Sequence, residues 1–283
     1  MLWLISSFTS ALVFGFSGFL LKVGCERGHK SHALLFGMYI TGTLLFALSL
    51  ILQQYWQLSV IVIVSSILVG IGSAVGNDYT VRALETGPAS ITSPLINLNI
   101  ILIVIMSMLL FGETLKSTEI IAIGLFIISC ALLSLDPREA LGIKDQRWYG
   151  FILLAIIFIF LRNGGLKVTQ EIGLNNTLVL FYAYLFSLLL FAGKFIPKGR
   201  LNIDKNNKNA VYLGGAAGIF SYGGLELYAY SLQIGPASVV ASIFSLRSMV
   251  MVVMAVLIYK ETLTFYQKLS ILAILTGTII ISL

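Results

Sequence analysis

The chain has 283 residues, of which 58% are hydrophobic and 11% charged, with a formal net charge of +6. This composition excludes a water-soluble globular domain, and the positive charge belongs to loop lysines and arginines, so it does not imply a nucleic-acid partner. Two cysteines exclude a disulfide framework, and the two histidines of "GHKSH" are more typical of a solvated loop than of a metal site, so we expect neither a metal nor a cofactor.

Apolar segments of about 20 residues follow one another along the chain, and a helix of that length crosses a hydrocarbon layer of ~30 Å. The ten segments are 2–22, 33–52, 60–84, 88–111, 118–135, 148–166, 176–196, 209–233, 236–258 and 265–283. The first lacks the basic start and the cleavage site of a signal peptide, so it is read as a helix. The sequence therefore predicts an all-α integral membrane protein with ten transmembrane helices.

The two halves of the chain carry related sequences. Residues 79–135 align with 227–283 without a gap and share 15 identities in 57 positions, including both copies of "GPAS". These ordered matches indicate a first repeat at 1–135, a connecting loop at 136–147 and a second repeat at 148–283. Because each repeat holds five helices, the second copy must enter the membrane from the opposite side. The sequence thus predicts two inverted five-helix repeats.

Both copies of "GPAS" are expected to make tight turns at the membrane face. Gly87 is predicted to adopt the left-handed conformation that ends one helix, and Pro88 to begin the next helix. The segments "FGETLKSTE" and "YKETLTFYQ" are likewise predicted to be turns between helices. We assign these motifs a structural role in preference to direct contact with a ligand.

Taken in order, these motifs resemble the EamA branch of the drug/metabolite transporter (DMT) superfamily. The resemblance depends on "FGFSGFLLK" at 14–22, the two "GPAS" turns, and "GETL" and "KETL" after the fourth and ninth helices, and it covers essentially the whole chain. It implies a transporter rather than an enzyme, with a first helix that lines the cavity. The chain departs from the family pattern at Phe14, where the family usually has Trp, so one cavity contact is expected to differ.

Polar residues inside apolar helices are informative, because each costs several kcal/mol unless it faces a partner or a water-filled cavity. Arg247 lies near the middle of 236–258, and its repeat equivalent Asn99 is equally deep in 88–111. At 100° per residue, Arg247 shares a face with Phe244 and lies opposite a stripe of small residues. We predict that the stripe packs on neighbouring helices and that Arg247 faces the cavity.

Two further polar positions lie deep in the third and eighth segments. Asp78 and Glu226 are equivalent in the repeat, with Arg82 one turn after Asp78 and two tyrosines, Tyr222 and Tyr230, one turn either side of Glu226. Desolvation favours a neutral carboxyl and a nearby arginine favours a charged one, so Asp78 or Glu226 is a candidate for carrying a coupling proton.

The sixth segment also contains "LRNGGLK", with Arg162 and Asn163 where an unbroken apolar helix would be expected. In the fourth segment, Pro94 precedes Asn97 and Asn99, and a proline frees a backbone carbonyl. Interrupted helices near the midplane are typical of transporter binding sites.

The sequence therefore predicts a secondary active transporter that moves a small polar metabolite, anionic or zwitterionic, by alternating access. Three intramembrane arginines outnumber two carboxylates, and an anionic substrate would neutralise the surplus charge. The candidate substrate-binding residues are Arg247 and Arg162 for the anionic group and Asn99, Asn163 and Tyr222 for neutral hydrogen bonds.

Three alternatives stay open. The intramembrane charges could be structural ion pairs that orient helices. A proton-coupled exporter of cationic or aromatic compounds would instead use Glu226 and its tyrosines. A membrane-embedded enzyme is disfavoured, because no catalytic or metal-ligand constellation lies inside the helices.

The expected partners are a small-molecule substrate, membrane lipid, and a proton or a counter-substrate, for a monomer or homodimer in the cytoplasmic (inner) membrane. Orientation is open. Most loop lysines and arginines lie on the face opposite both termini, which by the positive-inside rule puts the termini outside, whereas the resemblance implies cytoplasmic termini.

Overall fold

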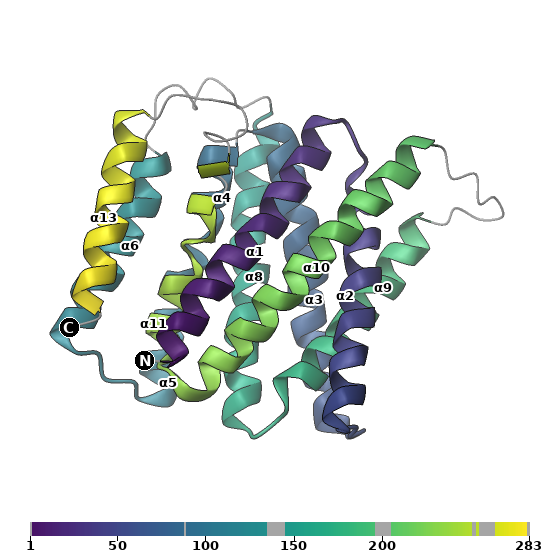
Figure 1. The fold of residues 1–283 in the computed structure, drawn as a ribbon, viewed down its shortest axis with the longest axis horizontal. Helices are drawn as coiled ribbons and strands as arrows, with labels where there is room; N and C mark the ends of the chain where they lie inside the picture. The colour runs from purple at the N-terminus through teal and green to yellow at the C-terminus, as the bar shows by residue number, and fades with distance from the viewer. Residues whose placement is uncertain are drawn as a thin grey trace.

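The computed structural model is a bundle of helices and describes residues 2–87, 89–134, 145–195, 205–250, 253–254 and 264–281. Figure 1 shows the helices side by side in an elongated arrangement, with the start of α1 and the end of α13 on the same, lower side. In chain order they are α1 (Leu2–Glu26), α2 (Ser31–Gln53), α3 (Val60–Thr86), α4 (Ala89–Ile96), α5 (Asn99–Phe111), α6 (Ser117–Ser134), α8 (Arg147–Glu171), α9 (Asn176–Phe195), α10 (Lys205–Ile234), α11 (Ala237–Phe244) and α13 (Phe265–Ile281).

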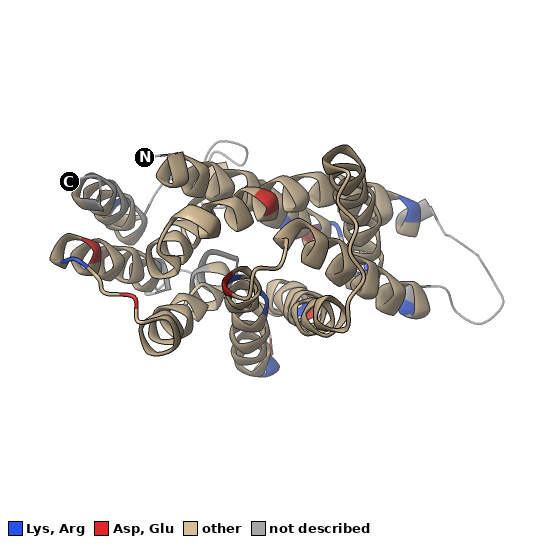
Figure 2. Cartoon of the chain, turned by 90° about the horizontal axis from the view of Figure 1, so that it is seen from below, with Lys and Arg blue, Asp and Glu red and all other residues tan. Residues whose placement is uncertain are grey.

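Within the described residues, five helices are long and apolar enough to cross a membrane: α1, α2, α3, α8 and α9. Shorter apolar helices cover Asn99–Phe111, Ser117–Ser129 and Ala237–Val250. Large apolar side chains point outward, among them Leu52 at 75% and Leu109 at 78% exposure, which suits contact with lipid. Seen from below, in Figure 2, charged residues are sparse along the helices. The all-helical, apolar architecture predicted from the sequence is confirmed.

The middle of the bundle is built from helices of both halves. α1 packs along α10, and α3 packs along α8. α2 and α9 pack on each other, and α2 also packs on α10 while α9 packs on α3. α6 and α13 pair at one edge (Figure 1). Glycine permits the closest of these approaches, because a Cβ added to Gly214 of α10 would lie 2.0 Å from the carbonyl oxygen of Leu34 in α2.

The fourth helix of each half is interrupted. The sequence predicted an interruption near Pro94 in 88–111, whereas 236–258 was expected to be continuous. Helix α4 ends at Ile96, and α11 ends at Phe244. At each break the backbone tightens to i→i−3 bonds, from Leu98 N to Leu95 O and from Leu246 N to Ile243 O, both 3.0 Å. The two breaks therefore fall at equivalent positions, 148 residues apart.

Contact between the two breaks offers a physical reason for them. Pro94 has no counterpart in the second copy, where Ser242 stands, so a proline is not the shared cause. The Asn97 side-chain amide donates a hydrogen bond to the carbonyl oxygen of Ser245, the residue at the equivalent position. The carbonyl oxygen at the second break is thus satisfied by a side chain of the other half of the chain.

The "GPAS" turns are shaped by tryptophans from the opposite half. Gly87 is extended, with φ −152° and ψ 172°, so the predicted left-handed conformation is wrong, and Pro88 lies outside the described residues. A Cβ at Gly87 would lie 2.3 Å from Nε1 of Trp148, which donates to Thr92 Oγ1 at 2.9 Å. Trp3 covers Gly235 in the same way, 2.8 Å from an added Cβ. Glycine is needed here for close contact with an indole ring.

The "GETL" segment also connects the two halves of the chain. Glu113 accepts hydrogen bonds from Ala237 N at 2.8 Å and from Ser238 N and Oγ at 3.2 and 2.7 Å. Lys167 Nζ lies 3.7 Å from the same carboxylate. A negative group at the start of α11 is stabilised by the unpaired N–H groups there. The related "KETL" at 260–263 lies outside the described residues.

Candidate substrate cavity

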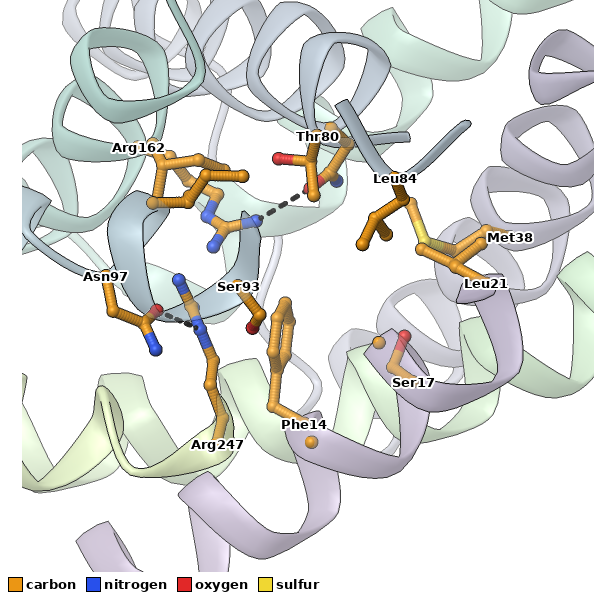
Figure 3. A pocket seen from close by; sticks show the side chains of 15 residues that line it. Phe14, Ser17, Leu21, Met38, Thr80, Leu84, Ser93, Asn97, Arg162 and Arg247 are labelled. Carbon is orange, nitrogen blue, oxygen red and sulfur yellow. Dashed lines mark hydrogen bonds between the residues drawn. The ribbon is translucent and has the colours of Figure 1, made fainter. Parts of the chain in front are cut away.

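A cavity of about 60 Å³ lies among α1, α3, α4, α8 and the segment after α11. Figure 3 shows its polar end, where Arg162, Arg247 and Asn97 converge, and its apolar end at Leu21, Met38 and Leu84. The lining residues are Phe14, Gly15, Ser17, Gly18, Leu21, Met38, Asn77, Thr80, Leu84, Ser93, Ile96, Asn97, Ile159, Arg162 and Arg247. Both halves of the chain contribute to its wall.

Arg162 is the most deeply buried charge of the cavity, with 0% exposure. Its Nε donates to Asn163 Oδ1 at 3.0 Å, and its Nη1 to Asn77 Oδ1 at 3.5 Å. Its Nη2 is buried and has no hydrogen-bond partner among the described residues, and no carboxylate among them forms an ion pair with Arg162. A buried cation held only by neutral amides favours an anionic ligand beside it.

Arg247 points into the same cavity from the break after α11. Its Nε donates to Asn97 Oδ1 at 3.0 Å, and its guanidinium lies 4.7 Å from the centroid of the Phe244 ring. The Phe14 ring lies 5.2 Å from the guanidinium carbons of both Arg162 and Arg247. One aromatic ring therefore packs against both guanidinium groups.

A chain of amides supports Arg162 from behind. Asn163 Nδ2 donates to Asn99 Oδ1 at 3.4 Å, and Asn99 in turn donates to the carbonyl oxygen of Ile96 at 2.7 Å. On the other side, Asn77 donates to Tyr39 OH at 3.0 Å. Asn99 and Asn163 thus stand behind the arginine and do not line the cavity. Asn163 contacts the Arg162 guanidinium directly and Asn99 holds Asn163, so together they orient Arg162.

The remaining candidates lie away from this cavity. Tyr222 hydrogen-bonds with Ser49 and stacks edge-on against Phe46. Asp78 accepts from Arg82 at 3.0 Å and from Lys194 at 3.4 Å. The structure therefore brings together Arg162, Arg247, Asn99 and Asn163, and separates Tyr222 and Asp78 from them.

Glu226 lies in a different cavity, lined by Gln53, Asn175, Thr177, Glu226, Leu227, Ala229, Tyr230 and Gln233. Its Oε1 accepts a hydrogen bond from Thr177 Oγ1 at 2.6 Å. Among the described residues, none lines both cavities. The two candidate coupling carboxylates, Asp78 and Glu226, thus have different surroundings, although their positions in the repeat are equivalent.

Several cavity residues escaped the sequence reasoning. Asn97, rather than Asn99, is the amide that holds Arg247. Asn77 was not singled out, although it lies one residue before Asp78 and turns toward Arg162. Phe14 was noted only as a departure from a family pattern. The repeat carries one indication of cavity residues. Ser17 and Arg162 occupy equivalent positions, 145 residues apart, and both line the cavity.

The fold and the cavity are those of a multi-pass membrane transporter. The model of the EamA-like transporter family matches residues 1–135 and 146–283, so the chain belongs to that family, whose members are transporters of the DMT superfamily and not enzymes. The predicted resemblance is confirmed.

Comparison with solved structures supports the fold alone. One, titled only "Crystal structure of protein", aligns with a TM-score of 0.66 at 15% identity, covering 97% of this chain and 98% of the other. No curated protein sequence matches this chain.

Proposed function

We propose that this chain is a secondary active transporter of a small anionic or zwitterionic metabolite, with Arg162 and Arg247 holding the anionic group. The observation that carries the proposal is the convergence of these two arginines on one cavity, over the shared Phe14 ring. Planar guanidinium groups match the two oxygens of a carboxylate or phosphate group. Asn97, Asn99 and Asn163 would keep both groups oriented while the site is empty.

The opposite wall of the cavity indicates a substrate with an apolar part. Leu21, Met38 and Leu84 lie at the end away from the arginines (Figure 3). Between the two ends, hydroxyl groups of Ser17, Thr80 and Ser93 line the wall. This arrangement suits a compact amphiphilic anion, whose charged group binds the arginines and whose apolar group displaces water at the far end.

Transport would proceed by alternating access between two inverted five-helix repeats, at residues 1–135 and 148–283. Three features favour this arrangement. The helix breaks at Asn97 and Ser245 are equivalent, and each "GPAS" turn is covered by a tryptophan of the other half. In addition, α1 packs on α10 and α3 packs on α8. Two copies related by a pseudo-two-fold axis reach inward-open and outward-open states of similar energy.

Between the two candidates for proton coupling, the surroundings favour Glu226. Asp78 is already neutralised by Arg82 and Lys194. Glu226 has a threonine hydroxyl on one oxygen, and its other oxygen, Oε2, is buried without a hydrogen-bond partner among the described residues. A carboxyl group in such surroundings can exchange a proton without breaking an ion pair.

Reconstituted transport tests the proposal. A thermal-shift screen of metabolites against the purified protein first identifies a ligand, because binding to the folded state raises apparent stability. Uptake of that compound, radiolabelled, is then measured in proteoliposomes. Arg162→Gln and Arg247→Gln should each lower kcat/KM about 10- to 150-fold, since a hydrogen bond to a charged group contributes about 1.5–3 kcal/mol.

The matched control is Arg82→Gln, because Arg82 pairs with Asp78 outside the cavity. Its transport should stay within about twofold of the unchanged protein. The assignment of the arginines would be wrong if Arg162→Gln and Arg247→Gln transported every accepted substrate as well as Arg82→Gln. Preference for cationic over anionic competitors would support the exporter of cationic or aromatic compounds instead.

A further inference from the structure

The cavity around Glu226 differs in chemistry from the arginine cavity. Its volume is about 410 Å³, so it admits a small organic molecule. Its described lining contains one carboxylate, that of Glu226, and neither lysine nor arginine. The other polar side chains are neutral, from Gln53, Asn175, Thr177, Tyr230 and Gln233. Among the described lining residues, an acidic side chain is therefore the only one that can carry a charge near neutral pH.

The repeat supplies an internal comparison for this carboxylate. At the equivalent position, Asp78 is satisfied by Arg82 Nη2 at 3.0 Å and Lys194 Nζ at 3.4 Å. The residue equivalent to Arg82, 148 positions later, is Tyr230, which lines the Glu226 cavity. The chain thus provides cations to one carboxylate and, in its described part, none to the other. Any cation that pairs with Glu226 therefore comes from outside the described residues.

One oxygen of Glu226 lacks a hydrogen-bond donor in the described part of the chain. Oε1 is occupied by Thr177 Oγ1 at 2.6 Å, whereas Oε2 is buried and has no hydrogen-bond partner among the described residues. A buried acceptor without a donor costs about 1–3 kcal/mol, and more when it is charged. A ligand that donates a hydrogen bond and carries positive charge removes that cost.

We propose that this cavity is a second binding site, selective for a small organic ammonium ion and separate from the arginine cavity. An ammonium group carries up to three N–H donors, which suit the Glu226 carboxylate and the side-chain oxygens of Gln53 and Gln233. The Tyr230 ring adds an aromatic surface of the kind that attracts cations. A bare metal ion fits less well, because it requires closely spaced oxygen ligands at about 2.0–2.6 Å and this cavity is wide.

Equilibrium binding of butylammonium to the purified, full-length protein tests this site. Butanol serves as the neutral analogue, and sodium chloride as the inorganic cation. The unchanged protein should bind butylammonium at least tenfold more tightly than butanol, and Glu226→Gln should weaken butylammonium binding at least tenfold. Asp78→Asn is the matched control, because that carboxylate is already paired, and it should bind as the unchanged protein does.

A second measurement does not depend on a variant that folds. Carbodiimide activates a carboxylate that it can reach, and an amine then forms the amide and releases the urea. Mass spectrometry of the unmodified Glu226 peptide reports access in the unchanged protein, because its loss counts the adducts of the added amine and of butylamine alike. Butylammonium should slow this modification at Glu226 severalfold and leave Glu171, which pairs with Lys167, unchanged. Butanol should protect neither residue.

The outcomes separate this site from the proposed function. Loss of butylammonium binding in Glu226→Gln, with retention in Arg162→Gln, supports a separate cation site whether or not the arginines bind an anion. Equal binding by Glu226→Gln and the unchanged protein would overturn the proposal. Binding of sodium as tight as that of butylammonium would also overturn it, and so would the absence of protection at Glu226.

Discussion

Replacing Glu113 by Gln tests how the two halves are held together. The carboxylate accepts two backbone N–H groups at the start of α11 and the Ser238 hydroxyl, at 2.7 to 3.2 Å. Gln keeps the size of the side chain but loses the charge, and its amide nitrogen cannot accept from Ser238. Loss of an N-terminal capping interaction costs about 0.5–2 kcal/mol, and loss of the charge–dipole term adds about 0.3–1 kcal/mol.

The nearby lysine limits this cost. Lys167 lies 2.7 Å from Glu171 as well as 3.7 Å from Glu113, so it keeps a carboxylate partner in the variant. We therefore expect a net loss of about 2 kcal/mol, which corresponds to roughly 4–8 °C in apparent Tm by the scaling for chains of this size. Differential scanning fluorimetry in detergent measures the shift.

Glu26→Gln is the matched control for Glu113→Gln. It removes the pair between Lys22 and Glu26, which has the same spacing as Lys167 and Glu171 but a more exposed lysine. An exposed pair contributes about 0–1 kcal/mol, so by the same scaling its Tm should fall by about 4 °C or less. Equal shifts in the two variants would refute the reasoning, because Glu113 would then stabilise no more than a surface ion pair does.

Three other substitutions probe the turn, the aromatic ring and the amide. Gly87→Ala should lower Tm by several degrees, because its Cβ would meet Trp148. Gly150→Ala has open space around it and should not lower Tm. Equal Tm values for the two variants would contradict the tryptophan contact. Phe14→Leu removes two cation–π contacts of about 0.5–2 kcal/mol each, so anion affinity in a filter-binding assay should fall about tenfold, and unchanged affinity would argue against the shared ring. Asn97→Leu removes the acceptor of Arg247 Nε, so kcat/KM in proteoliposomes should fall at least tenfold with the Tm within a few degrees; normal transport would show that this hydrogen bond is dispensable.

The sequence predicted the helical architecture well because hydrophobic length is a direct physical requirement of a bilayer. It was less informative about backbone detail at polar positions. Pro94 indicated an interruption in the fourth helix. No local pattern indicated the equivalent break at Ser245, whose carbonyl oxygen accepts a hydrogen bond from Asn97 in the other half. Gly87 misled for a similar reason, because turn chemistry favoured a left-handed glycine while the structure uses glycine to admit Trp148.

The cavity was predictable in its charges and less so in its partners. Arg162 and Arg247 were evident because a buried arginine has few explanations inside an apolar helix. The choice between Asn97 and Asn99 was not evident, since the broken helix rotates Asn97 toward Arg247 and Asn99 toward Asn163. Phe14 was hard to assign from sequence, because an aromatic residue in a membrane helix is ordinarily a packing residue.

The most direct test of the arginine cavity compares a bound carboxylate with its uncharged amide analogue in the unchanged protein and in Arg162→Gln. The ratio of the two dissociation constants isolates the interaction with the charge. The account predicts that the unchanged protein prefers the carboxylate by tenfold or more and that Arg162→Gln loses most of this preference, about 1.4 kcal/mol for each factor of ten. An undiminished preference in Arg162→Gln would contradict the assignment of this buried arginine to the substrate anion.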